Sequence, residues 1–255
     1  MLFIFKKKTI VLDCITSNLG IFNYYPIVKS NTNLPTWWKN LPESYVCGRT
    51  PEFDKLDRHS STMKKCSGFI DLHKNSIAIP SNCDVKIQTT ESGIFGYQFS
   101  DSSGMENFSI DSHSREEFGS ELDHLIHLKI ISPWLLFEKT GINFHVCMPF
   151  WHHIKTLDKV FIPPGIVNYK YQHTSHINMF VPRADDLIEF TAGTPLLHLI
   201  PLTEHKVEVK NHIVDDAEFL KLHKHAGLRS RFLNSYMLQK KILKASNKCP
   251  FNFKN

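Results

Sequence analysis

The chain has 255 residues, of which 42% are hydrophobic and 22% charged, with a formal net charge of +5. This composition is ordinary for a soluble globular protein, and no apolar run approaches the length that a bilayer-spanning helix needs. We therefore expect one globular domain and no membrane span. The basic residues are spread along the chain without a binding motif, so we do not expect nucleic acid as a partner.

The N-terminus and the cysteines bear on where the protein resides. Met1 and four apolar residues precede Lys6-Lys7-Lys8, which reverses the order of charge and apolar run in a secretory signal. We expect no export through a signal peptide. The six cysteines lie far apart and form no C-x-x-C pair, which predicts reduced, mostly buried thiols rather than a zinc ribbon or a redox dithiol.

Residues 1–61 are expected to form short N-terminal strands, at 2–5 and 9–12, followed by an extended arm. Pro26 and Pro35 favour an extended path and exclude a helix over residues 18–40, apart from a short turn at 36–39. The adjacent Trp37 and Trp38 are candidates for an interaction. They can stack on a base or a sugar, or anchor the arm on the body of the protein.

Residues 62–210 are expected to form the β core. Strands are predicted over 62–72, 76–80 and 84–90, where the last alternates strictly between apolar and polar residues, and a hairpin joins it to 97–99. Residues 100–107 are expected to be a loop, and 114–128 a short helix or turn. Strand character resumes over 129–136, 143–148 and 206–210.

Two glycine-containing motifs lie within residues 161–202. The first is Gly165-Ile-Val-Asn168-Tyr-Lys-Tyr171, and the second is Gly193-Thr-Pro-Leu-Leu-His198. Residues 211–255 have helical character from 215 to 244, with a break expected at Gly227. We predict a mainly β, antiparallel jelly-roll or β-clip with an extended N-terminal arm and C-terminal helices.

Six short motifs are distributed along the whole chain. They are Pro35-x-Trp-Trp38-Lys-x-Leu, Thr62-Met-Lys-Lys-Cys66-x-x-Phe-x-Asp71, Ser132-Pro-Trp134, Pro164-Gly-Ile-Val, Gly193-Thr-Pro-Leu-x-x-Leu-Ile-Pro201 and Leu228-Arg-Ser-Arg-Phe232-x-x-Ser-Tyr236. Taken together, these motifs resemble those of a family of uncharacterised proteins from tailed marine phages, especially cyanophages, and from some marine bacteria. The resemblance implies a phage context and no activity.

Within residues 161–202 the chain is also similar to the dUTPase and dCTP-deaminase β-clip superfamily. That resemblance implies a nucleotide pocket formed by Gly165, Asn168, Tyr171 and His198. The superfamily has an aspartate that orients or activates the attacking water, and here Asn168 stands in its place. An amide cannot act as a general base near neutral pH, and no phosphate-binding Arg-Ser-Gly motif is found upstream. We therefore expect the hydrolase site to be inactive.

The fifteen histidines raise the question of a metal. An oxygenase or cupin site is usually announced by His-x-Asp/Glu or His-x-His on a strand, and the chain has only His223-Lys-His225, in its helical tail. On a helix His124 and His127 would share a face, whereas on a strand they would not. Without a spacing motif we assign no metal ligands, no cofactor and no catalytic residue.

Three functional hypotheses follow from the sequence. The first is a non-enzymatic phage-encoded protein, virion-associated or bound to a host component, oligomeric, and residing in the host cytoplasm or the virion. Interaction candidates are Trp37, Trp38, Arg229 and Tyr236. The second is a nucleotide-binding or nucleotide-hydrolysing protein of the dUTPase-like superfamily. The third is a metal-dependent enzyme of the iron/2-oxoglutarate or cupin type.

Overall fold

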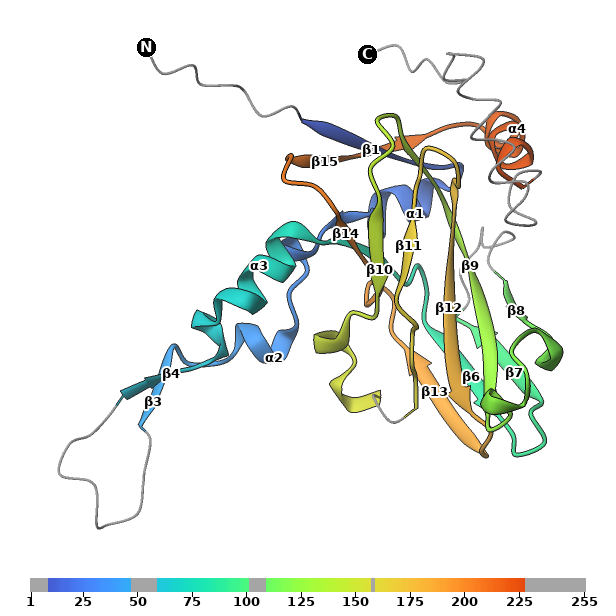
Figure 1. Cartoon of the computed structure of the whole chain (residues 1–255), viewed down its shortest axis with the longest axis horizontal. Coiled ribbons are helices and arrows are strands. Elements are labelled where there is room, and N and C mark those ends of the chain that lie inside the picture. Colours follow the sequence, from blue (N-terminus) through green and yellow to red (C-terminus); the bar gives the residue numbers. More distant parts are fainter. Residues whose placement is uncertain (1–8, 47–58, 101–108, 157–158, 228–255) are drawn as a thin grey trace.

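The computed structural model describes residues 9–46, 59–100, 109–156 and 159–227. This part of the chain is mainly β, and all but one of its strand pairs are antiparallel (Figure 1). The predicted fold class is therefore confirmed. The finer assignment to a jelly-roll or β-clip stays a prediction.

One sheet, here called sheet A, has five strands in the order β12-β9-β1-β15, with β8 paired to β9. The exceptional parallel pair joins β1 to β15, whereas β9 is antiparallel to β1, β8 and β12. The predicted N-terminal and C-terminal strands thus lie side by side. The strands of sheet A are β1 (Ile10–Thr16), β8 (Ile110–Ser112), β9 (Leu125–Glu138), β12 (Thr174–Pro182) and β15 (Val207–Ile213).

A second sheet, sheet B, has the order β11-β10-β14-β5-β2, and a three-stranded sheet has the order β13-β6-β7. A further two-stranded ribbon, β3-β4, belongs to the arm. The strands of these sheets are β2 (Val28–Lys29), β3 (Ser44–Val46), β4 (His59–Ser61), β5 (Ile77–Pro80), β6 (Val85–Thr89), β7 (Phe95–Phe99), β10 (Phe144–Cys147), β11 (Gly165–Val167), β13 (Asp186–Phe190) and β14 (Pro195–Pro201).

The main core lies between sheet A on one side and the other two large sheets on the other. Leu12 and Leu128 come from sheet A, Ile79 and Leu199 from sheet B, and Ile87 from β6, and all are buried in one apolar cluster. The strict alternation of burial along β6 matches the alternation in its sequence. Together with the β6–β7 pairing, it confirms the predicted hairpin.

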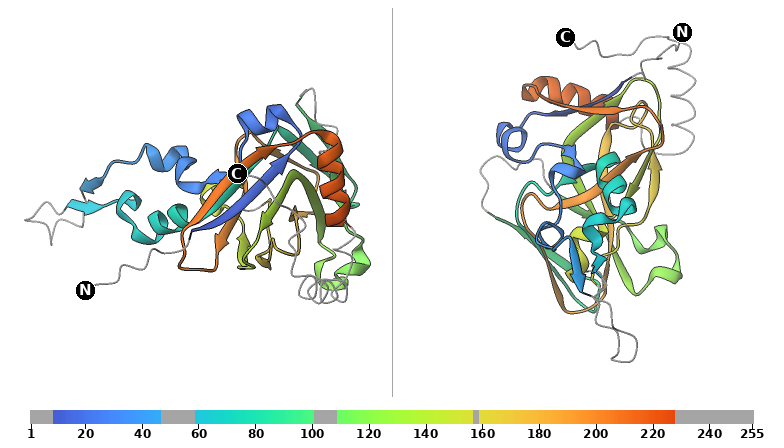
Figure 2. Two further views of the ribbon diagram at one scale, coloured as in Figure 1. Left: turned by 90° about the horizontal axis from the view of Figure 1, so that it is seen from above. Right: turned by 90° about the vertical axis from the view of Figure 1, so that its left-hand side faces the viewer.

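The outer face of sheet A is covered by α4 (Asp216–Gly227). Phe219 and Leu222 of this helix pack against Ile15, Leu135 and Phe137, which alternate with the core-facing residues of β1 and β9. Seen from above, α4 lies on the opposite side of the body from the arm (Figure 2, left). The predicted C-terminal helix is confirmed over α4, and the rest of that prediction falls outside the described residues.

The prediction that residues 18–40 contain no helix beyond one short turn is wrong. Residues 19–24 form α1 (Leu19–Tyr24), and the Asn18 side chain caps it by accepting a hydrogen bond from the Ile21 amide at 3.0 Å. Pro26 follows the helix rather than interrupting it. The predicted short turn is confirmed as α2 (Thr36–Lys39), which begins directly after Pro35.

The predicted strand over residues 62–72 is also wrong. These residues form a 3₁₀ turn, η2 (Met63–Lys65), and then α3 (Ser67–Asn75), which crosses the outer face of sheet B. Phe69 and His73 lie one helical turn apart and are both buried, at 3% and 1% exposure. Because burying this one face favours a helix, the apolar residues that suggested a strand form the buried side of α3 instead.

The remaining helical elements are short turns. In residues 114–128, where a helix or turn was expected, two 3₁₀ turns precede β9, which already contains Leu125 and Ile126. The predicted loop at 100–107 falls almost wholly outside the described residues. The 3₁₀ turns besides η2 are η1 (Ser30–Thr32), η3 (Arg115–Glu117), η4 (Ser120–Leu122), η5 (Phe150–His152) and η6 (Ile154–Thr156).

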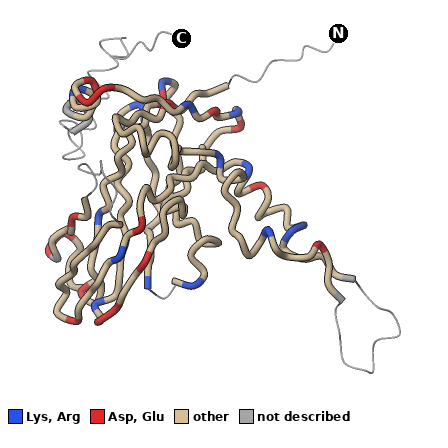
Figure 3. Tube along the Cα trace, turned by 180° about the vertical axis from the view of Figure 1, so that it is seen from behind, with Lys and Arg blue, Asp and Glu red and all other residues tan. Residues whose placement is uncertain are grey.

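Basic and acidic residues are interspersed along the described trace (Figure 3). Some face each other across strands, as in the 2.8 Å ion pair between Lys86 on β6 and Glu189 on β13. Among the described residues, no helix combines the length and apolar character required to cross a bilayer.

Candidate metal centre

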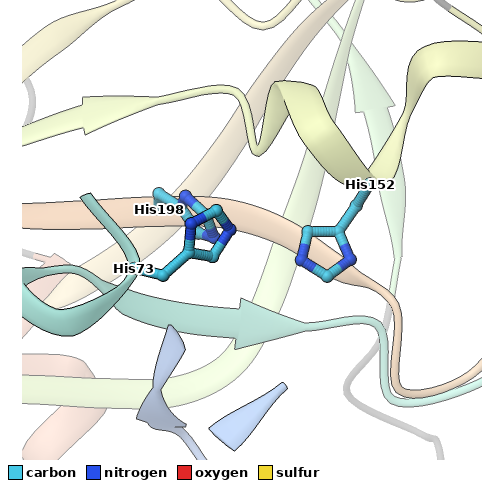
Figure 4. A group of neighbouring side chains, drawn as sticks. All are labelled: His73, His152 and His198. Atoms are coloured by element: carbon cyan, nitrogen blue, oxygen red, sulfur yellow. The ribbon is translucent and has the colours of Figure 1, made fainter. Parts of the chain in front are cut away.

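Three histidines from distant parts of the sequence meet on the outer side of sheet B. His73 comes from α3, His152 ends η5, and His198 lies in the middle of β14 (Figure 4). Their ligand atoms, one ring nitrogen each, all lie within 4.8 Å of one another. Among the described residues this is the one cluster of histidine, cysteine or carboxylate side chains with such spacing.

The helix α3 fixes the position of His73 through its aromatic neighbour Phe69. The Phe69 ring stacks on Trp38, with centroids 5.1 Å apart, and meets the edges of Trp37 and Trp151. One turn later the His73 ring stacks on Phe69 at 4.1 Å. The aromatic residues of the arm therefore hold the helical face that carries His73 against the sheet.

A hydrogen bond selects the tautomer of His73. Its Nδ1 lies 2.9 Å from the carbonyl oxygen of Phe69, and because a carbonyl only accepts, Nδ1 is the donor. In a neutral ring the proton then sits on Nδ1, and Nε2 carries a lone pair. Metal-binding histidines characteristically donate their second nitrogen to a backbone carbonyl or carboxylate in this way.

The strand β14 turns His198 toward α3. Its neighbours Leu197 and Leu199 belong to the main core, so by strand alternation the His198 side chain points to the outer face. Directly across from it lie Ala78 on β5 and Cys147 on β10. The short side chain of Ala78 leaves room beside the His198 ring, which is 2% exposed.

His152 lies in the turn that follows β10, and this turn positions it beside the other two histidines. Two contacts anchor this turn: Trp37 donates its indole N–H to the Trp151 carbonyl at 2.8 Å, and His153 Nε2 donates to the Pro195 carbonyl at 2.7 Å. The two adjacent histidines thus take different roles. His153 ties the turn to the start of β14, and His152 joins the cluster.

The electrostatics of the cluster suit a metal ion. Burial, reinforced by the neighbouring imidazoles, lowers the pKa of His198 to about 3 and that of His152 to about 4, and burial also lowers the pKa of His73. All three rings are therefore neutral at pH 7, which is the form that binds metals. The Nε2 atoms of all three are buried and have no hydrogen-bond partner among the described residues.

Those unpartnered nitrogens distinguish a binding site from ordinary packing. A buried polar atom without a partner costs about 1–3 kcal/mol, so three at one point make an unfavourable arrangement unless something binds them. In a tetrahedral zinc site with Zn–N distances of about 2.0–2.1 Å, ligand nitrogens are roughly 3.3–3.4 Å apart. The ligand atoms here lie within 4.8 Å of one another, so the rings would move closer together on binding an ion.

A pocket of ≈ 420 Å³ adjoins the cluster at His152. Trp37 and Trp151 line it together with Phe190 from β13, and Thr191 and Thr194 add hydroxyl groups. Because the cluster supplies three ligands, a four-coordinate ion would retain one open position. The pocket provides space beside the cluster for a ligand.

The residues expected to form a nucleotide pocket have other contacts. Asn168 donates its amide N–H groups to the Gly141 carbonyl and to Asn143 Oδ1, both at 2.9 Å, and so holds a turn. Tyr171 is 9% exposed, and Gly165 lies on β11, separated from β14 by β10. Of the four, the structure places His198 in the histidine cluster.

The interaction candidates Trp37 and Trp38 are half-buried and hydrogen-bonded, since the Trp38 indole donates to the Met63 carbonyl at 3.1 Å. They anchor the arm, as in the second of the two interpretations. Arg229 and Tyr236 fall outside the described residues. His124 and His127 do not share a helical face, because His127 lies on β9.

Sequence reasoning did not identify the histidine cluster. The sequence predicts no role for His73 or His152, and it places His198 in a nucleotide pocket. No spacing motif links them, because three separate elements carry them. No family model and no curated protein matches the chain.

Proposed function

We propose that this protein binds a divalent transition-metal ion, of which zinc is the best fit, through Nε2 of His73, His152 and His198. The observation that carries the proposal is the convergence of three histidines whose ligand atoms lie within 4.8 Å of one another, each with a buried, unpartnered Nε2. Imidazole ligands suit zinc, copper, iron and nickel, whereas magnesium and calcium prefer oxygen.

We further propose that the centre is of the open, catalytic type. Structural zinc sites are closed by four protein ligands, while catalytic sites keep a position for water or substrate. An open position beside the pocket at His152 would let a metal-bound water act on a molecule held there. Since no carboxylate from the described part of the chain joins the cluster, it does not match the two-histidine, one-carboxylate set of the iron oxygenases.

The test is metal content and affinity in protein purified without a histidine tag. We expect one zinc per chain by elemental analysis, and a Kd below about 1 μM, equivalent to about −8 kcal/mol, in a competition titration with a chromophoric chelator. The variants His73→Gln, His152→Gln and His198→Gln should each lose this affinity. His124→Gln, which replaces an exposed histidine outside the cluster, is the matched control.

Circular dichroism of each variant establishes that loss of metal is not loss of fold. If the folded triple variant binds zinc as tightly as the parent protein, the proposal is wrong. The proposal would also be wrong if the parent protein contained much less than one zinc per chain and bound zinc with a Kd above about 1 μM.

The hypothesis of a virion-associated or host-interacting phage protein rests on the sequence motifs alone and is compatible with a metal centre. It stays a proposal, as do the expected oligomer, the location in host cytoplasm or virion, and the nucleotide alternative. Mass spectrometry of purified virions tests the first, and absence of the chain at good coverage would contradict it.

A further inference from the structure

A second pocket, separate from the histidine cluster, lies beside β8. Figure 1 shows β8 on the opposite side of the body from α3. The pocket has a volume of ≈ 90 Å³ and shares no lining residue with the pocket at His152. Its walls come from β8, the 3₁₀ turns before β9, the start of β9, the end of β12 and the β6–β7 turn. Three segments of the chain, within 93–95, 112–127 and 180–183, therefore line it.

The pocket holds one cationic side chain and no carboxylate among its lining residues. That cation is Arg183, which follows β12, and its Nε is buried without a hydrogen-bond partner. Glu117 lies nearby but does not line the pocket, and its carboxylate is bonded to His113 Nδ1 at 2.5 Å. Asp185, two residues from the arginine, accepts a hydrogen bond from the Glu91 amide instead.

Gly93 positions the guanidinium. A Cβ at this glycine would lie 2.7 Å from Cζ of Arg183 and 2.8 Å from Nη2, and the backbone there has a φ of +84°. Only a residue without a side chain allows the guanidinium to rest on this turn. The arginine is thus held by packing, while its Nε–H remains available for a ligand.

The rest of the lining combines aromatic rings with aliphatic side chains and the serines Ser112 and Ser114. It also contains a second unpartnered polar atom, on His127. His127 is 8% exposed, and its Nδ1 has no hydrogen-bond partner. Its ring lies between His113 at 4.5 Å and Phe180 at 4.8 Å, with the edge of Phe118 at 4.6 Å. Since burial lowers the pKa of His127 to about 4, the ring is neutral at pH 7 and can donate from Nδ1.

We infer that this pocket binds a small carboxylate of two to four carbon atoms. A carboxylate pairs with the donor fork of Arg183 and can accept from His127 Nδ1–H, which satisfies both orphaned atoms. Its short carbon chain would contact Phe118 and Phe180. The volume of ≈ 90 Å³ is smaller than the roughly 150 Å³ of a cavity that holds benzene, so we expect an aromatic acid to bind more weakly than a short aliphatic one.

The test uses propionate as the probe, with propionamide as a neutral isostere and benzoate as a size control, all at one ionic strength. Calorimetry and saturation-transfer NMR measure binding, and long-range ¹H–¹⁵N spectra of the imidazoles report whether the His127 ring senses the ligand. We expect saturable binding of propionate that perturbs His127. Propionamide and benzoate should bind at least tenfold more weakly.

Two variants test the role of the guanidinium. Arg183→Gln should weaken propionate binding about tenfold or more, because a hydrogen bond to a charged partner is lost. Gly93→Ala should weaken it by displacing the guanidinium, even though Arg183 is intact. Lys210→Gln, which removes an exposed cation on β15, is the matched control and should bind normally.

Equal binding of propionate and propionamide would overturn the inference, as would unchanged affinity in folded Arg183→Gln protein. Absence of saturable propionate binding to the parent protein would overturn it as well. None of these outcomes depends on the metal centre, because the two sites share no residue.

Discussion

His73 donates its Nδ1–H to the carbonyl oxygen of Phe69, one helical turn earlier, at 2.9 Å. Phe69 has two roles in this arrangement. Its ring packs against Trp38 of the arm and so holds α3 in place, and its carbonyl oxygen sets the tautomer of His73. In the neutral ring the lone pair is then on Nε2, the buried atom without a hydrogen-bond partner, before any metal binds. Such preorganisation reduces the cost of forming a metal site.

The first prediction concerns this link. Phe69→Leu keeps an apolar side chain but removes the ring stacks on Trp38 and His73, so we expect a loss of about 1–2 kcal/mol in the free energy of unfolding. Zinc affinity should fall as well, since α3 is held less firmly. Urea denaturation and chelator competition measure the two effects.

The control for Phe69→Leu is Ile70→Ala on the exposed side of α3, where the side chain is 42% exposed. We expect its unfolding free energy to change by no more than about 0.5 kcal/mol and its zinc affinity to stay the same. If Phe69→Leu lowered stability but left zinc affinity at the level of the control, the proposed link from Phe69 to the cluster would be wrong.

The second prediction concerns acid stability. Burial lowers the pKa of His198 to about 3, and those of His152, His127 and His176 to about 4, whereas in the unfolded chain each is near 6.5. Between these values the unfolded state binds more protons, so stability rises with pH there. The stabilisation that each neutral, buried histidine contributes to folding is fully present above pH 6.5. It is lost as the pH falls toward 4 for three of the rings and toward 3 for His198.

Urea midpoints measured with a chelator at pH 7.5, 6.5, 5.5 and 4.5 test this behaviour. Each histidine adds a slope of up to about 1.4 kcal/mol per pH unit. The free energy of unfolding should begin to fall steeply below pH 6.5, before most carboxylates titrate. The variant His198→Gln should show a smaller slope, by up to about 1.4 kcal/mol per pH unit, because it lacks one titrating group. A midpoint independent of pH between 7.5 and 5.5 would contradict the buried, neutral state of these rings.

The third prediction asks whether sulfur completes the metal centre. Cys147 lies opposite His198 across the β10–β14 pair, yet the group of ligand atoms within 4.8 Å contains only the three histidines among the described residues. Burial raises the pKa of the Cys147 thiol, which opposes the thiolate form that binds metals. We therefore expect no sulfur ligand.

Cobalt substitution provides the measurement, because a cobalt–thiolate bond gives an intense charge-transfer band in the near ultraviolet. The Co(II) protein should lack this band, and Cys147→Ser should leave the visible spectrum and the Co(II) affinity unchanged. A charge-transfer band that disappears in Cys147→Ser would show a closed, four-ligand site and would contradict the open position proposed above.

The sheet strands were the most predictable part of the fold. The β6–β7 hairpin could be predicted because Val85, Ile87 and Thr89 face the core while Lys86 and Gln88 face solvent. An alternation of apolar and polar residues of this kind can be read from the sequence alone. The same reasoning failed at α3, where Phe69 and His73 become a helical face only because Trp37 and Trp38, some thirty residues earlier, pack on it.

The candidate metal centre could not be predicted from spacing. Recognisable metal motifs place ligands a few residues apart on one element, whereas His73, His152 and His198 belong to a helix, a turn and a strand. Their proximity depends on α3 crossing sheet B and on the turn after β10 folding toward Trp37. Both are tertiary arrangements with no local signal.

The last prediction concerns Asn168, which the β-clip resemblance placed where the superfamily has an aspartate. Its amide donates to the Gly141 carbonyl and to Asn143 Oδ1, and the same turn is bound by the buried Glu138 carboxylate, which accepts from the Gly141 amide at 2.6 Å and the Ile142 amide at 3.0 Å. Asn168→Asp removes both donated hydrogen bonds and adds a negative charge near Glu138. We expect a loss of about 1–3 kcal/mol in the free energy of unfolding and no gain of nucleotide hydrolysis.

Urea denaturation and a phosphate-release assay with nucleoside triphosphates measure these two outcomes. Asn143→Ala is the matched control, because it removes one of the two acceptors and leaves the bond to Gly141, so its loss should be smaller. If Asn168→Asp were as stable as the parent protein and hydrolysed a nucleotide, Asn168 would occupy a catalytic position rather than a structural one. Because both of its donors are already engaged within the turn, we expect the structural outcome.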